Sequence, residues 1–156
     1  MKNLFIVVIA LLMSIGVNAQ HKITSPHPDL SIKVSRCVEA NGTVILDLMI
    51  TNLGNEEEIR FWGNATSPGT IAYDDEGNIY DSTISVGSPS KSLSGNRTYI
   101  VFPTDVPIKF RIQIDKVDPN ATKIAVLKLK TSSSGAMGLD QNKHVIQLQN
   151  IEFERK

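Results

Sequence analysis

Residues 106–115 read VPIKFRIQID, with an apolar side chain at every second position from Val106 to Ile114. Successive side chains of a β-strand point to opposite faces, so this order places the five apolar side chains on one face. An α-helix would distribute them around its whole circumference. The segment therefore predicts a strand with one buried face and one solvated face.

The same period of two extends outward from this segment in both directions. Residues 30–39 and 43–52 alternate on either side of Asn41-Gly42, a dipeptide typical of a type I′ hairpin turn because both of its central positions need a positive φ. The last strand, at 144–154, changes phase after Leu148, which indicates a β-bulge near Gln149-Asn150. Further strands are predicted at residues 59–62, 71–73, 79–80, 84–86, 99–102 and 123–130.

These segments give about eight or nine short strands at spacings of roughly ten residues, with no helical period between them. The expected fold is all-β: an antiparallel two-sheet immunoglobulin-like sandwich, preferred to a closed barrel because the strand lengths are uneven. We expect a single β-sandwich domain over residues 29–156, preceded by a flexible N-terminal arm at 20–28.

The first 19 residues have the three parts of a secretory signal peptide. Lys2 supplies the positive charge, residues 4–13 are an unbroken apolar run, and a small-residue pattern ends at Ala19. An apolar run of this length is shorter than the roughly 20 residues that span a bilayer. We therefore expect cleavage before Gln20 and an exported protein, periplasmic or extracellular, with no integral membrane segment after processing.

Composition excludes several classes of protein. The chain has 156 residues, 41% of them hydrophobic and 21% charged, with a formal net charge of +0. This balance is typical of a globular domain and gives no field for binding nucleic acid.

The single cysteine, Cys37, cannot form an internal disulfide. We expect it to be buried, which requires a break in strand register near Arg36, and we expect a monomer.

The parts of a catalytic or metal site are missing. The histidines His21, His27 and His144 are scattered, and no G-x-S-x-G motif is present. One cysteine and three separated histidines do not have the spacing of zinc ligands. We therefore expect no enzymatic activity, no catalytic residue, no metal site and no cofactor.

Aromatic residues and a polar hairpin loop supply the candidate binding residues. Trp62 follows Phe61, so one of the two should be buried and the other partly exposed. The remaining candidates lie on one hairpin, where the carboxylates are expected to be solvated: Tyr73, Asp74, Asp75, Glu76 and Tyr80. Trp62 and Tyr80 could stack on sugar rings. Asp74, Asp75 or Glu76 could serve a carboxylate-dependent glycan hydrolase, and this alternative ranks below binding.

Charge is distributed unevenly along the chain. Segment 56–81 carries seven acidic residues, whereas 109–130 carries six basic ones. An acidic end could steer a basic protein partner. We therefore expect an interaction module for a cell-envelope or extracellular protein, with a glycan as the alternative ligand.

Four segments resemble small secreted immunoglobulin-like β-sandwich proteins of Gram-negative bacteria. They are the strand 44–52 ending in Thr-Asn, the hairpin 72–80, Val106-Pro107-Ile108, and Asn150-Ile151-Glu152-Phe153. The resemblance implies the fold and an exported bacterial setting, and it supplies no catalytic residue. Asp81-Ser82-Thr83 is also similar to an acceptor for general O-glycosylation in such bacteria, which makes Ser82 a candidate glycan site.

Overall fold

The computed structural model describes residues 21–62, 69–87, 91–92, 97–133 and 144–156. The predicted signal peptide and its cleavage site lie outside these residues. The described residues form strands and no helix. The strands are β1 (Lys22–Thr24), β2 (Leu30–Ala40), β3 (Thr43–Asn52), β4 (Glu57–Trp62), β5 (Ile71–Asp74), β6 (Ile79–Val86), β7 (Lys91–Ser92), β8 (Arg97–Phe102), β9 (Pro107–Ile114), β10 (Lys123–Ser133), β11 (Val145–Glu152) and β12 (Glu154–Arg155).

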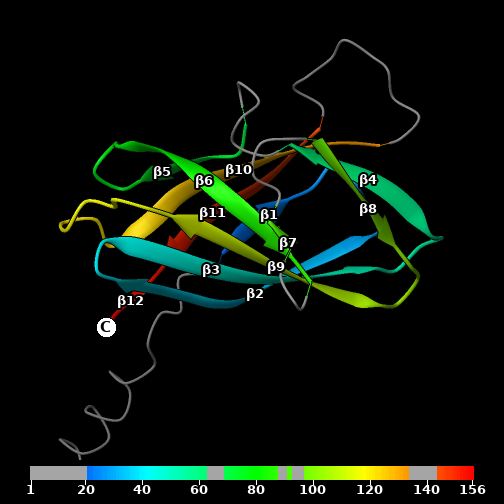
Figure 1. Cartoon of the computed structure of the whole chain (residues 1–156), viewed down its shortest axis with the longest axis horizontal. Coiled ribbons are helices and arrows are strands. Elements are labelled where there is room, and N and C mark those ends of the chain that lie inside the picture. The colour runs from blue at the N-terminus through cyan, green and yellow to red at the C-terminus, as the bar shows by residue number, and fades with distance from the viewer. Residues whose placement is uncertain (1–20, 63–68, 88–90, 93–96, 134–143) are drawn as a thin grey trace, which may run out of the picture.

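The strands form one continuous curled sheet. Its hydrogen-bonded path runs β1-β11-β10-β5-β6-β9-β3-β2-β12, with β4 attached to β10, β8 attached to β4 and β7 attached to β6. All pairings along the path are antiparallel except that of β12 with β2. Figure 1 shows the resulting half-barrel. The all-β antiparallel prediction is confirmed.

The strands do not divide into two separate sheets. Strand β6 joins one half of the sheet, formed by β1, β11, β10 and β5, to the other half, formed by β9, β3, β2 and β12. Its first residues pair with β5, as in Ile71 with Asp81, and its later residues pair with β9, as in Ser82 with Ile114. The sheet therefore bends along β6 without a break in its hydrogen bonding. The segment at 84–86, expected as a separate strand, is the end of β6.

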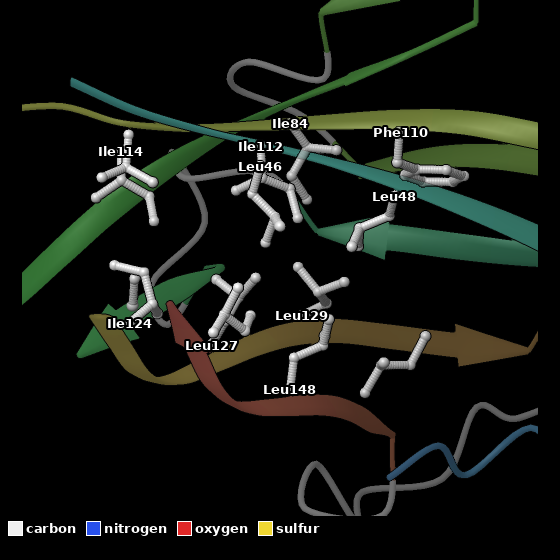
Figure 2. Close-up of a cluster of buried hydrophobic side chains, with 14 of the residues drawn as sticks. Leu46, Leu48, Ile84, Phe110, Ile112, Ile114, Ile124, Leu127, Leu129 and Leu148 are labelled. Atoms are coloured by element: carbon white, nitrogen blue, oxygen red, sulfur yellow. The ribbon is translucent and has the colours of Figure 1, made fainter. Parts of the chain in front are cut away.

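The hydrophobic core lies between the two halves of this curled sheet. Figure 2 shows side chains from β3, β6 and β9 facing side chains from β10 and β11. The labelled residues of the core are Leu46, Leu48, Ile84, Phe110, Ile112 and Ile114 on one side, and Ile124, Leu127, Leu129 and Leu148 on the other. Strands β4 and β8 cover one end, where Phe61 and Phe102 pack on Phe110 with ring centroids 5.0 and 6.0 Å away.

Two local predictions, the type I′ turn at Asn41-Gly42 and the register break near Arg36, are confirmed. Asn41 and Gly42 both have a positive φ, 53° and 77°, as a type I′ turn requires. The β2–β3 register shifts between Val34 and Arg36, and this break turns Cys37 toward the core, where it is partly buried. At the predicted β-bulge, Asn150 has φ 55° and the buried positions change phase, but the β10–β11 register continues without a shift from Lys123–Glu152 to Val126–Gln149.

The N-terminal arm predicted at 20–28 contains a short strand. Lys22–Thr24 pairs with Gln147–Gln149 of β11 and forms one end of the sheet path. Farther along the arm, His27 is buried against Thr131 of β10. The described part of the arm is thus integrated into the sheet.

Candidate ligand-binding surface

The carboxylate of Asp74 is buried at the base of the β5–β6 hairpin, with 3% of the residue exposed. It accepts hydrogen bonds from the backbone N–H groups of Glu76 and Asn78, from the Asn78 amide and from the Tyr80 hydroxyl. Burial alone would raise the pKa of Asp74, but these hydrogen bonds outweigh it and hold the pKa below its usual value. The expectation that this carboxylate is solvated is wrong, because the loop folds back around it.

Asp75 is exposed but also bound within the protein. Its carboxylate accepts hydrogen bonds from the Thr122 backbone N–H and hydroxyl, and from the Lys123 backbone N–H. Burial, the largest single influence, raises the pKa of Asp75, but the hydrogen bonds to its carboxylate, those from Thr122 first, together lower the pKa by more. A glycosidase needs one carboxylic acid with a raised pKa. Asp74 and Asp75 are both shifted in the opposite direction, and Glu76 is an exposed neighbour.

Trp62 and Tyr80 lie on opposite faces of the curled sheet. Phe61 is fully buried and Trp62 is half-buried on the other face, which confirms the prediction that the two would point apart. Tyr80 pairs with Ala72, a core residue, and its ring packs against the core. Since cross-strand partners share a face, Tyr80 points inward, and the two residues cannot bind one ligand together.

The outer face brings Trp62 and Tyr73 together with two lysines of β10. Lys130 Nζ lies 4.7 Å from the centroid of the Trp62 ring, and Lys128 Nζ lies 5.3 Å from that of Tyr73. We call these four residues the aromatic–lysine surface. Sequence reasoning missed the lysines as site residues, because their approach to the aromatic rings depends on which strands pair with β10.

The acidic segment 56–81 does not form a single acidic end. On β10, Ser133 pairs with Ile59 of β4 and Ile124 pairs with Asp74 of β5. These positions lie about 30 Å apart along the strand, given its rise of roughly 3.3 Å per residue. Figure 1 shows the β5–β6 hairpin and the β4–β8 pair at opposite ends of the molecule.

Ser82, the candidate O-glycosylation residue, is 1% exposed. Its hydroxyl donates a hydrogen bond of 3.2 Å to the backbone carbonyl of Thr70. A transferase could therefore reach Ser82 only in an unfolded or locally opened chain.

Within the described ranges, no group of three or more His, Cys, Asp or Glu residues is placed to hold a metal ion. None of the described residues forms a helix with the length and hydropathy needed to span a bilayer. Comparison with protein-family models, with curated proteins and with solved structures finds no match to this chain.

Proposed function

We propose that the protein is a non-enzymatic, exported binding module of the cell envelope that engages an acidic protein partner through the aromatic–lysine surface. The observation that carries this proposal is the seating of Lys128 and Lys130 on the rings of Tyr73 and Trp62. A cation–π contact contributes about 0.5–1 kcal/mol at an exposed site. The rings thereby restrict two long cationic side chains before a ligand arrives.

The spacing of the lysines favours an extended acidic segment as the ligand. Residues two apart on a strand lie roughly 7 Å apart on one face, which is also the spacing of alternate carboxylates in an extended polypeptide. Tyr and Trp are enriched at protein interfaces and at their energetic centres. The partner's carboxylates would face Lys128 and Lys130, so electrostatic steering would attract an acidic partner. The sequence alone instead predicts that the acidic segment 56–81 steers a basic partner.

A glycan remains the second candidate ligand. Tyr73 pairs with Val126, and Phe61 pairs with Thr131 on the same edge of β10, so Tyr73 and Trp62 lie roughly 13 Å apart at 3.3 Å per residue. That span suits an oligosaccharide. However, each ring already has a lysine over one face, and a sugar stacking on that face would have to displace it.

We also infer that the curled sheet is a variant of the immunoglobulin-like sandwich suggested by the four sequence segments. The support for this inference is that its two halves face each other across one core (Figure 2). Export and cleavage before Gln20 belong to the same proposal. Mass spectrometry of the protein from its native host tests both, and a retained Met1 segment would contradict them.

The binding proposal is tested with a fluorescent peptide of alternating glutamate and serine. Charge reversal at Lys128 and Lys130 together should weaken binding about tenfold, equivalent to roughly 0.7 kcal/mol per lysine, and added salt should weaken the wild-type complex. Lys109→Glu is the matched control, because Lys109 is exposed on β9 in the other half of the sheet. Equal losses in the control and the double variant would contradict the proposal. Salt-independent retention on a glycan array that is lost in Trp62→Ala would favour the glycan.

A further inference from the structure

A groove of about 920 Å³ opens where the curled sheet fails to close. It lies between the two ends of the strand path, with β1 and the end of β11 on one side and β2 on the other, and Phe153 leads the chain from β11 to β12 at the edge of β2. Its lining includes His21 and Ile23, the β2 segment 32–37, and Glu152, Phe153 and Glu154. It shares no residue with the aromatic–lysine surface.

The floor of the groove is an uncovered margin of the hydrophobic core. Ile32, Val34 and Cys37 pair with Ile50, Leu48 and Leu46 of β3, which are fully buried. Cross-strand partners share a face, so these β2 side chains point toward the core but are only half-buried. In each of these three cross-strand pairs, the β3 side chain is buried in the core and the β2 side chain is half exposed to the groove.

The β2 strand also has a largely open edge on this side. Among the described strands, β12 is the one that pairs with this edge, through Glu154 with Val38 and Arg155 with Glu39. Residues 30–37 thus have no strand partner there within the described ranges. Exposed edges are commonly covered or guarded because their backbone N–H and C=O groups pair readily with another chain.

Strand β12 shows that this edge accepts another strand. It lies parallel to β2, and the backbone N–H of Lys156 donates a hydrogen bond of 3.0 Å to the Glu39 carbonyl. Along the same edge of β2, the groove extends from β12 toward the beginning of β2. A ligand that fills it must offer backbone hydrogen-bonding groups to the edge and apolar side chains to the floor. An extended polypeptide has both, whereas a lipid or a sugar lacks one of them.

We propose that this groove is a strand-acceptor site, in which an extended segment of a partner protein pairs with β2 over residues 32–36 and inserts alternate apolar side chains beside Val34 and Cys37. Backbone pairing gives affinity in this mode, and the pockets for alternate side chains give specificity. The rim carries both signs of charge, with Lys33 and Arg36 on β2, Glu152 at the end of β11 and Glu154 on β12. The outward side chains of the segment are therefore polar.

The probe is a synthetic peptide of alternating isoleucine and threonine with a lysine at each end. Its matched control is the same peptide with N-methyl groups on alternate residues, which keeps the side chains and blocks backbone pairing. Fluorescence anisotropy should show binding of the unmodified peptide and a loss of about tenfold or more on methylation. Hydrogen exchange of the complex should show new protection of amides within residues 30–37. Equal binding of the two peptides, or protection confined to other strands, would overturn the proposal.

A substitution tests the floor of the groove independently. Val34→Lys should weaken binding of the unmodified peptide, whereas Val101→Lys, at an exposed position of β8, should leave it unchanged. Should Val34→Lys fail to fold, the wild-type comparison of the two peptides decides the question alone. Sedimentation of the free protein provides the last check. A dimer whose amides at 30–37 are already protected would make a second copy the occupant and overturn the proposal of a partner segment.

Discussion

Tyr80 Oη lies 2.6 Å from Asp74 Oδ2 and donates a hydrogen bond to it across the base of the β5–β6 hairpin. The same hydroxyl accepts a hydrogen bond of 3.0 Å from the backbone N–H of Asp118. A single phenol thus connects the hairpin to the loop before β10. The carboxylate and tyrosine that the sequence offered as ligand contacts are structural partners of each other.

Tyr80→Phe should lower the free energy of unfolding by roughly 1.5–3 kcal/mol, the typical worth of a hydrogen bond to a charged group. The substitution leaves the ring in place and removes one of the donors that satisfy the buried carboxylate. Urea unfolding measures the effect. Tyr73→Phe is the control, expected within about 0.5 kcal/mol of wild type because Tyr73 lies on the outer face. Equal effects of the two substitutions would show that the Tyr80 hydroxyl has no special role.

The depressed pKa of Asp74 predicts an acid-sensitive contribution to stability. An aspartate whose pKa is lower in the folded than in the unfolded protein stabilises the fold fully above the unfolded value, about 3.9, and loses that contribution as pH falls through the folded value. The stability difference between wild type and Asp74→Asn should therefore be constant above about pH 5 and should shrink below about pH 4. Urea titrations at several pH values test this. A difference that stays constant down to pH 2.5 would contradict it.

A cluster of one aspartate and two arginines on the outer face of β2, β3 and β9 was not predicted from the sequence. Asp47 is 4% exposed and accepts hydrogen bonds from Arg111 Nε at 2.8 Å and Arg111 Nη2 at 3.2 Å, and it also contacts Arg36. The hydrogen bond from Arg111 lowers the pKa of Asp47 despite its burial. The strand pattern assigns Asp47 to the solvated face, and it is buried because two long side chains from neighbouring strands cover it.

Asp47→Asn should lower the free energy of unfolding by roughly 1.5–3 kcal/mol, through loss of the charge-assisted hydrogen bonds. Arg111→Gln should cost more than Arg36→Gln, because Arg111 bonds both carboxylate oxygens. A double-mutant cycle between each arginine and Asp47 measures the two couplings. A larger coupling for Arg36 would contradict this assignment.

Sequence periodicity predicted most of the residues that face the core, and the Asn41-Gly42 turn predicted the pairing of β2 with β3, but the pairing of strands distant in sequence was not predicted. The Asn41-Gly42 turn, the register break before Arg36 and the phase change at Asn150 are local events, and each left a local signal. The passage of β6 from β5 to β9 left none, because alternation continues through it. Asp74 was misjudged for a related reason. Its burial depends on bonds from Asn78 and Tyr80 that form only when the loop closes.

Cys37 should react slowly with thiol reagents. Burial raises its pKa to about 12, with a smaller contribution from Asp47. Relative to an ordinary thiol of pKa about 8.5, the thiolate fraction at pH 8 falls roughly 10³-fold, and the greater nucleophilicity of a more basic thiolate recovers part of this. We expect reaction with 5,5′-dithiobis(2-nitrobenzoate) to be roughly 10–100-fold slower than for glutathione. Reaction at the glutathione rate in native buffer would contradict this expectation, and denaturant should abolish the difference.

The buried imidazole of His27 lies between two polar partners. Thr131 Oγ1 donates to the backbone carbonyl of His144, so its lone pair accepts from His27 Nε2 at 3.1 Å. In the neutral ring this places the unprotonated Nδ1 at 3.5 Å from a Glu57 carboxylate oxygen. Burial lowers the pKa of His27, the Glu57 charge and hydrogen bond partly oppose this, and His144 adds to the lowering.

The lowered pKa of His27 predicts that stability falls on mild acidification. Because the unfolded histidine binds its proton at about pH 6.5 and the folded one only at lower pH, the free energy of unfolding should decrease as pH falls below about 6.5, until the folded group is protonated as well. His27→Gln should remove this slope, and His21→Gln, at an exposed position, should keep it. Glu57→Gln should steepen the slope, since the opposing charge is lost. Urea unfolding between pH 5 and 8 measures all four proteins, and identical slopes in wild type and His27→Gln would show that His27 does not titrate differently on folding.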